Sequence, residues 1–392
     1  MKKLFLLLSI ALLLSSCHNH DEPDPVVATR TVLAYMGGDG LASFINDNVN
    51  DMIRGYSTVT TGNNLLIYMD GGSSSVDTLY KLVKNRSGII EKKVIKTYQN
   101  QISTDKAVME KVFSDAFTAC PAESYGAIFS SHGTAWLPAS KTVQSKSFGS
   151  DSGYQINIPE MALVLNDIAS KFKRFDFLLF DACFMGSTEV AYEFKDVSDY
   201  LIASSGEILG AGFPYKDVTP YLFNTGEDNL KMIAQLFYNS YNTQSGAYRS
   251  AIVSVVNLNY MESLASQMKR IIGEHLVKVN SFSPAGFQYF DGNGIAGDVN
   301  GQHIFYDLKQ FVDSLSTDDA LFKRTLESAV IYKANTPNLS SEWKYEDIIP
   351  IDEFCGLSIY IPQQGRTAYN NFFKTLSWFN ASGWNQTAWG TN

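Results

Sequence analysis

Short, mainly apolar runs recur along the chain and constrain its fold more than any other feature of the sequence. Such runs occur at 31–36, 65–69, 125–129, 175–180, 200–203, 251–256 and 356–361. A strand whose residues are all apolar is buried on both faces, whereas a half-exposed strand alternates apolar and polar residues. Helix-like stretches separate most of these runs, and that alternation is typical of a parallel sheet with helices on both faces. We therefore predict an α/β fold with a mostly parallel central sheet.

The segments between these runs complete the outline. A hairpin is expected at 78–83 and 89–95, and a polar loop is expected from 134 to about 155. Helices are predicted around Phe44, Val49 and Ile53, and at 103–117 (with Ser103 as N-cap), 159–172, 190–194, 230–241, 260–279, 306–315 and 320–333. There is no internal repeat and no low-complexity linker. These features favour a single domain with C-terminal helical elaborations.

The N-terminus carries a targeting signal. Two lysines precede an apolar run at 4–14, which is too short to cross a bilayer as a mature helix. The run ends in Leu14-Ser15-Ser16-Cys17, which resembles a bacterial lipobox. We predict that residues 1–16 are a lipoprotein signal peptide and that Cys17 becomes the lipidated first residue. The alternative is an ordinary secretory signal with a cysteine nearby.

A lipidated N-terminus anchors the protein to the bacterial cell envelope, at a lipid membrane. Residues 17–29 are polar and rich in proline, so they are expected to form a flexible tether. The folded domain is then expected to span residues 30–392, and no later stretch approaches eighteen unbroken apolar residues.

Charge and cysteine content exclude several classes of protein. The 392-residue chain has a net charge of −9 and no run rich in Lys or Arg, so a nucleic-acid partner is not expected. A local acidic pocket for basic substrates remains compatible with this charge. If Cys17 is lipidated, Cys120, Cys183 and Cys355 remain, an odd number at no metal-like spacing. The chain is therefore not a disulfide scaffold, and we predict no metal site and no cofactor.

Four loops follow directly on the predicted strands, at 37–40, 70–72, 132–133 and 181–183. Ligands bind at the carboxyl ends of the strands in open α/β sheets, so a site is expected where these loops meet. The two glycine-rich loops match neither the dinucleotide-binding pattern nor the P-loop. They are better explained as tight turns beside an active site.

A histidine and a cysteine occupy the other two loops. His132 follows directly on a buried strand, unlike His18, His20, His275 and His303. Cys183 follows another strand, at Asp181-Ala182-Cys183, ahead of an expected helix. Each residue alone has a structural alternative, since lone histidines and free cysteines are commonly packed in cores. Together they suggest a thiolate nucleophile with an imidazole partner, and the backbone N–H groups of Gly133 and Cys183 would face a developing oxyanion.

The segments Ser131-His132-Gly133-Thr134-Ala135-Trp136 and Phe180-Asp181-Ala182-Cys183-Phe184-Met185-Gly186 resemble the His and Cys motifs of the clostripain-like cysteine peptidases. The histidine precedes the cysteine by about fifty residues, as it does in caspases. Further segments resemble that family at 35–39, 189–193, 212–215 and 356–362. The resemblance thus extends over nearly the whole expected domain.

This resemblance implies a caspase-like α/β/α sandwich, a Cys-His dyad and cleavage after Arg or Lys. By position, Cys183 would be the nucleophile and His132 the general acid and base. Asp181 would be the acidic residue of the substrate pocket, where a carboxylate pairs well with a guanidinium or ammonium group. A loop-bracing carboxylate is the alternative for Asp181, and Glu207 is a second acidic candidate.

The chain also departs from the family pattern. Ser131 stands where an acidic residue is usual, Gly37 stands where Asp is usual, and 204–206 replaces an acidic pair. Calcium dependence, known in some relatives, does not follow from these residues.

Relatives are often activated by cleavage between the histidine and the cysteine, and the 134–155 loop contains two basic residues. Self-cleavage after Lys146 or Lys141 is therefore predicted, with an ordinary solvated loop as the alternative. Our interpretation is a lipid-anchored cysteine endopeptidase that acts on peptides containing Arg or Lys. The alternatives are a catalytically silent binding lipoprotein and a peptidase of the same fold that cleaves after Asn or Asp.

Overall fold

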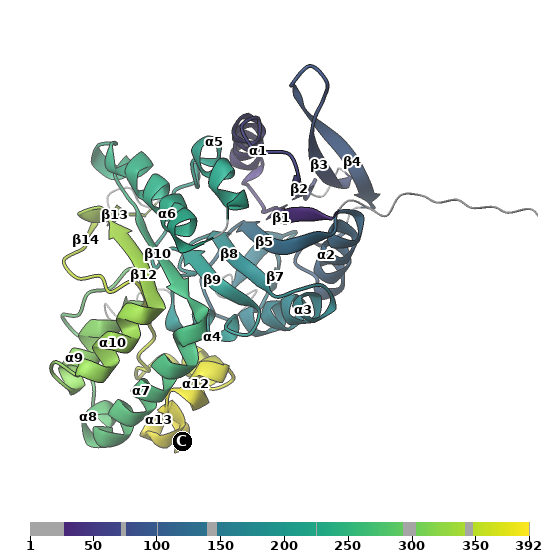
Figure 1. Ribbon diagram of the computed structural model, residues 1–392. Coiled ribbons are helices and arrows are strands. Elements are labelled where there is room, and N and C mark those ends of the chain that lie inside the picture. Colours follow the sequence, from purple (N-terminus) through teal and green to yellow (C-terminus); the bar gives the residue numbers. More distant parts are fainter. Residues whose placement is uncertain are drawn as a thin grey trace, which may run out of the picture.

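The computed structural model describes residues 27–71, 76–99, 101–138, 147–224, 226–292, 303–341 and 348–391. It confirms the predicted α/β fold, because a nine-stranded sheet lies between layers of helices (Figure 1). The predicted lipidation site, Cys17, and the predicted processing sites, Lys141 and Lys146, lie outside the described residues. Among the described helices, none is long and apolar enough to cross a membrane.

Five parallel strands form the centre of the sheet, in the spatial order β9-β8-β5-β1-β2. They are β1 (Ala28–Met36), β2 (Asn63–Met69), β5 (Ala122–Ser130), β8 (Phe175–Asp181) and β9 (Ser198–Ala203). Met36 of β1 pairs with Ser130 of β5, which in turn pairs with Asp181 of β8. The last residues of three neighbouring strands are therefore level, and the loops that follow them meet at one edge of the sheet.

Antiparallel strands extend the sheet on both sides. The predicted hairpin consists of β3 (Asp77–Lys84) and β4 (Ile90–Tyr98), and β3 pairs with β2. On the other side, β10 (Ile252–Asn257) pairs with β9, and β12 (Val330–Asn335) pairs with β10. The helix predicted at 320–333 was too long: α10 (Ala320–Ala329) ends at Ala329, and β12 begins at the next residue.

Helices cover both faces of the sheet (Figure 1). One face packs against α1 (Ala42–Tyr56), α5 (Tyr215–Val218) and α6 (Glu227–Asn242). The other packs against α2 (Lys106–Ala119), α3 (Ile158–Lys171), α4 (Thr188–Glu193), α7 (Met261–Glu274) and α9 (Leu308–Leu315), together with α10. Successive residues of one strand enter opposite layers: Leu178 and Phe180 face the second layer, and Leu179 faces the first. This double burial explains why successive residues in the middle of these strands are apolar.

Other predicted boundaries also differ from the observed ones. The N-cap of α2 is Asp105, whose carboxylate accepts the N–H groups of Ala107 and Val108, and not Ser103. The predicted helix at 260–279 is interrupted at His275, after which α8 (Leu276–Asn280) begins. The predicted polar loop contains a small hairpin, β6 (Phe148–Asp151) and β7 (Tyr154–Ile156).

The C-terminal region packs around the second helical layer. The predicted strand at 356–361 is only β15 (Ser358–Ile359), which pairs with β11 (Tyr306–Asp307) outside the main sheet. A separate short hairpin joins β13 (Asn338–Ser340) and β14 (Ile348–Pro350). The chain continues through α11 (Thr367–Phe373), α12 (Ser377–Ala381) and α13 (Ala388–Thr391).

Candidate active site

The His132 and Cys183 loops touch at the carboxyl edge of the sheet. They follow β5 and β8, whose ends are paired in register. Gly133 is held so close to the cysteine loop that a Cβ atom there would lie 2.8 Å from the Cys183 carbonyl oxygen and 3.4 Å from its nitrogen. Only glycine fits this contact without displacing backbone. Both His132 and Cys183 line one cavity of about 290 Å³.

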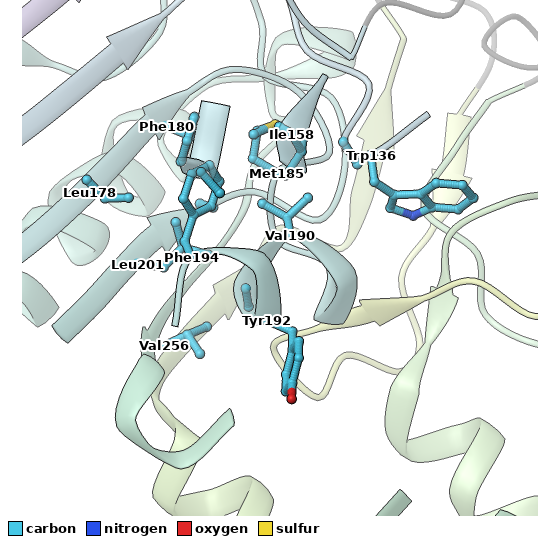
Figure 2. Close-up of a cluster of buried hydrophobic side chains, with 14 of the residues drawn as sticks. Trp136, Ile158, Leu178, Phe180, Met185, Val190, Tyr192, Phe194, Leu201 and Val256 are labelled. Atoms are coloured by element: carbon cyan, nitrogen blue, oxygen red, sulfur yellow. The ribbon is translucent and has the colours of Figure 1, made fainter. Parts of the chain in front are cut away.

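The cysteine loop rests on the apolar core. Figure 2 shows Phe180, Met185 and Val190 among the side chains of this core, on either side of the loop in sequence. Backbone hydrogen bonds tie the loop to the segment after β9: Phe184 N–H donates to Gly206 O at 2.9 Å, and Gly186 N–H donates to Ser204 O at 2.7 Å. Core packing and these bonds together fix the position of Cys183.

The Cys183 sulfur is half-buried and faces the backbone of the loop after β9. The Ile208 N–H points at Sγ, with 3.3 Å between nitrogen and sulfur. The thiol in turn donates toward the Ile208 carbonyl oxygen, at 3.6 Å from the sulfur. The expected helix N-terminus is not adjacent, because α4 begins only at Thr188, with Ser187 as its N-cap. The backbone of Ile208, and not a helix N-terminus, therefore contacts the sulfur.

The other described cysteines are buried. Burial raises the pKa of the Cys120 thiol, and it raises the pKa of the Cys355 thiol well above its usual value. Neither residue lines the cavity. Of the three described cysteines, Cys183 is thus the one placed for nucleophilic chemistry.

The His132 imidazole is held by a main-chain carbonyl. Its Nε2 lies 2.9 Å from the carbonyl oxygen of Asp39, in the loop after β1. A carbonyl oxygen only accepts hydrogen bonds, so Nε2 carries the proton of this pair. In the neutral ring the other nitrogen, Nδ1, is then the one able to take up a proton. The sequence contained no local signal for this partner.

Asp181 lies at the base of the cavity, 6% exposed. Its Oδ2 accepts a hydrogen bond from the Tyr215 hydroxyl at 3.0 Å and a longer one from the Phe213 N–H at 3.5 Å. Burial raises the pKa of the carboxyl to about 6, although these donors act to lower it. The backbone passes close by at Gly212, where a Cβ atom would lie 2.5 Å from Oδ2.

The cavity has apolar walls and acidic groups. Leu41, Phe44 and Ile45 contribute side chains from the start of α1 and the residue before it. Glu207 lies in the loop after β9 and lines the cavity together with Asp181. Among its described lining residues there are two carboxylates and no Lys or Arg. This arrangement suits a long side chain with a cationic end.

The structure explains one departure from the family pattern. At Gly37, a Cβ atom would lie 2.7 Å from Cβ of Asp70 and 3.0 Å from its Oδ2. The Asp70 side chain, which follows β2, therefore fills the space that a side chain at position 37 would need. Glycine at 37 and aspartate at 70 fit together.

A buried carboxylate missed by the sequence analysis connects the cysteine loop to the C-terminal region. Glu189, in the first turn of α4, has no exposed surface, and its Oε1 accepts the Tyr360 N–H at 2.8 Å. Next to it, Ser358 N–H donates to the Gly186 carbonyl at 3.0 Å. Burial raises the pKa of Glu189 to about 7. The loop that carries Cys183 is thus braced from both sides.

Within the described ranges, no three His, Cys, Asp or Glu side chains are grouped to hold a metal ion. The predicted histidine, cysteine and two carboxylates all meet at one cavity, whereas His275 ends α7 and His303 contacts Asp291.

Solved structures share this fold over nearly the whole chain. A secreted C11 cysteine protease from Bacteroides thetaiotaomicron, in complex with an irreversible peptide inhibitor, is 31% identical; the match covers 91% of this chain and 99% of that chain, with a TM-score of 0.78. An inactive zymogen C11 protease from Parabacteroides distasonis is 30% identical, with the same coverage and a TM-score of 0.79. A clostripain from Bacteroides thetaiotaomicron, in complex with the peptide inhibitor BTN-VLTK-AOMK, is 29% identical over 60% of this chain and 97% of that chain, with a TM-score of 0.51.

Sequence comparison leads to the same group. Clostripain from Hathewaya histolytica is 25% identical over a stretch that covers 48% of this chain and 41% of that protein. The match therefore spans less than half the length of that relative. The family model of the clostripain family matches residues 34–389, which is nearly all of the described chain. These matches confirm the resemblance seen in the His and Cys motifs: the chain belongs to the clostripain family of cysteine peptidases.

Proposed function

We propose that the protein is an endopeptidase in which Cys183 attacks the peptide carbonyl and His132 transfers the protons. The attack forms a thioester acyl-enzyme; His132 protonates the leaving amine and then removes a proton from the water that hydrolyses the thioester. This proposal rests on one observation: His132 and Cys183 line the same cavity, and their loops are in contact at Gly133.

The backbone of the same two loops is proposed to stabilise the oxyanion. The N–H groups of Gly133 and Cys183 belong to the two segments that are in contact, and we propose that both face the carbonyl oxygen of the bound substrate. Backbone donors of this kind stabilise charge that develops on the carbonyl oxygen.

We propose that the substrate has Arg or Lys before the scissile bond. Asp181 and Glu207 provide negative charge at a cavity with apolar walls, which is complementary to a long cationic side chain. The peptide inhibitor bound by the Bacteroides thetaiotaomicron clostripain has the sequence VLTK, which ends in lysine and supports this specificity.

Activation and location are further parts of the proposal. Self-cleavage after Lys146 or Lys141 would convert a single-chain precursor into the active enzyme, and the existence of an inactive zymogen in the family supports such a step. The relatives from Bacteroides thetaiotaomicron described as secreted support a place outside the cytoplasm. We propose that Cys17 is lipidated and holds the enzyme at the cell envelope.

A panel of fluorogenic peptides with Arg, Lys, Asn or Asp before the scissile bond tests this function. Turnover of the Arg and Lys peptides, lost in Cys183→Ala and in His132→Ala, is the expected result. Preference for Asn or Asp would contradict the basic specificity. Lack of turnover with all four peptides, even after the loop has been cleaved by an added protease, would favour a silent binding protein.

A further inference from the structure

The carbonyl that holds the His132 ring belongs to a residue with little backbone support of its own. Asp39 lies between Gly38 and Gly40, and Gly40 has a φ of +80°. Glycines permit many backbone conformations, so a loop of this composition does not by itself hold a carbonyl in one direction. Another group must fix the Asp39 peptide if it is to orient the imidazole.

The Asp39 side chain supplies that fixation. Its Oδ1 accepts the Ser152 N–H at 3.1 Å, and its Oδ2 accepts the Ser150 hydroxyl at 2.8 Å and the Gly153 N–H at 3.2 Å. The Asp39 N–H donates to Ser150 O at 2.7 Å. Four hydrogen bonds thus connect this one residue to the β6–β7 hairpin, two to Ser150 in β6 and two to the turn at Ser152 and Gly153. Bonds from several donors to a carboxylate are among the stronger hydrogen bonds in proteins.

The same hairpin holds the main chain of His132. The Gly149 N–H donates to the His132 carbonyl at 2.9 Å, and the Thr134 N–H donates to Ser147 O at 3.0 Å. Residues 147–153 therefore contact the histidine twice: directly through its backbone, and through Asp39 at its ring. The β6–β7 hairpin therefore positions both the ring and the backbone of His132.

We propose that Asp39 is a positioning residue for His132, and that its carboxylate, held by the β6–β7 turn, directs its own carbonyl at Nε2. This inference rests on the proposed role of His132 as general acid and base. With the carbonyl in place, Nε2 keeps its proton and Nδ1 is the nitrogen that exchanges a proton with the reacting groups. The carbonyl also stabilises the imidazolium that forms when the ring is doubly protonated.

Asp39→Ala is the main test, measured on the full-length protein with a lysyl fluorogenic peptide. We expect kcat to fall roughly 10- to 100-fold with KM nearly unchanged, because a displaced catalytic group lowers the rate and not the affinity. The alkaline limb of the kcat/KM profile is expected to move to lower pH, because the imidazolium loses a hydrogen-bond partner. Asp39→Asn, which keeps one side-chain acceptor, is expected to recover part of the loss. Asp47→Ala on the exposed face of α1 is the matched control and should behave like the wild type.

Each outcome supports or contradicts the inference. A rise in KM with kcat unchanged would show that Asp39 binds substrate instead, and a wild-type pH profile in Asp39→Ala would show that the ring does not depend on it. If Asp39→Ala fails to fold, Ser150→Ala removes only one donor, and unchanged kcat and pH profile in that variant would contradict the inference. His132→Ala separates the two proposals: activity retained there contradicts the proposed dyad, whereas activity lost there but unaffected by Asp39→Ala contradicts only the positioning role.

Discussion

The Tyr215 hydroxyl donates a hydrogen bond to Oδ2 of Asp181 at 3.0 Å, so the proposed specificity carboxylate is itself held by a residue that does not line the cavity. Burial raises the pKa of this carboxyl to about 6, and the hydrogen bond from Tyr215 opposes that rise. The charge that would attract Arg or Lys therefore changes within a pH range in which most aspartates stay ionised.

We expect affinity for a cationic ligand to fall as the pH drops through about 6. Above that pH Asp181 is ionised and pairs with the ligand; below it the carboxyl is protonated and the pair is lost. Calorimetry of agmatine binding to Cys183→Ala at pH 5 to 8 measures this without a contribution from the thiol. Affinity that does not change over this range would show that Asp181 does not bind the cation.

Tyr215→Phe is expected to move the same transition to higher pH, because it removes a donor that favours the carboxylate. Tyr98→Phe is the control for Tyr215→Phe, since it removes a tyrosine hydroxyl at the end of β4 that donates to Asp115 of α2.

Asp181→Asn is expected to lower kcat/KM for lysyl peptides about 100-fold at pH 8, as the loss of one partner of a buried charge pair commonly does.

Glu189→Gln is expected to stabilise the protein at pH 8 and to have little effect at pH 4.5. The folded-state pKa of Glu189 is raised to about 7, so the folded protein binds more protons than the unfolded chain between about pH 4.5 and 7. Stability associated with this group is full below that window and is lost as the pH rises through it. A shift of this size corresponds to about 3 kcal/mol at pH 8.

Urea unfolding of both proteins at several pH values measures this difference. Glutamine keeps the oxygen that accepts the Tyr360 N–H and removes the charge. Unfolding free energies that change in parallel with pH for wild type and variant would contradict the assignment.

Gly133→Ala is expected to abolish most activity, because its Cβ would lie 2.8 Å from the Cys183 carbonyl oxygen and would push the two loops apart. Displacement by about an ångström lowers kcat roughly 100-fold. Gly273→Ala in α7 is the matched control: the nearest atom to its Cβ is 3.7 Å away, so it should keep activity and gain about 0.5 to 1 kcal/mol of stability. Equal activity of the two variants would show that the close contact at Gly133 is not needed.

Replacing both Lys141 and Lys146 by alanine is expected to leave a single chain after incubation, whereas the wild-type protein yields two fragments. Mass spectrometry of the fragments from each single variant identifies the bond. Ser147, the residue after Lys146, has no exposed surface, so cleavage there places a new ammonium group at a buried position and requires Ser147 to move. Fragments that still form in the double variant would contradict the prediction that these lysines direct the cleavage.

The sequence predicted the centre of the fold because its signals there are local. Each central strand contains an apolar run, and the residue types that follow β5 and β8 singled out His132 and Cys183 as candidates. The edge strand β12 was not predicted. It follows α10 without a break, and its conformation is determined by pairing with β10, about 80 residues earlier in the chain.

The groups that hold the proposed catalytic residues could not be predicted from the sequence for a similar reason. Asp39 contacts residues 150–153, more than one hundred positions further along the chain. The Ile208 amide faces the sulfur through its backbone, which no residue type identifies. Asp181, in contrast, was found by its position in the motif, although Tyr215 as its partner was not.

The brace between the cysteine loop and β15 has a consequence for the order in which the enzyme is made. A ribosome releases residue 183 long before residues 358 and 360, whose N–H groups bond to Gly186 and Glu189. Before residues 358–360 have been synthesised, the loop that carries Cys183 lacks the hydrogen bond from Ser358, and the Glu189 side chain lacks the hydrogen bond from the Tyr360 N–H. Synthesis can thus proceed with an incomplete protease, and a chain truncated before residue 358 is expected to be inert.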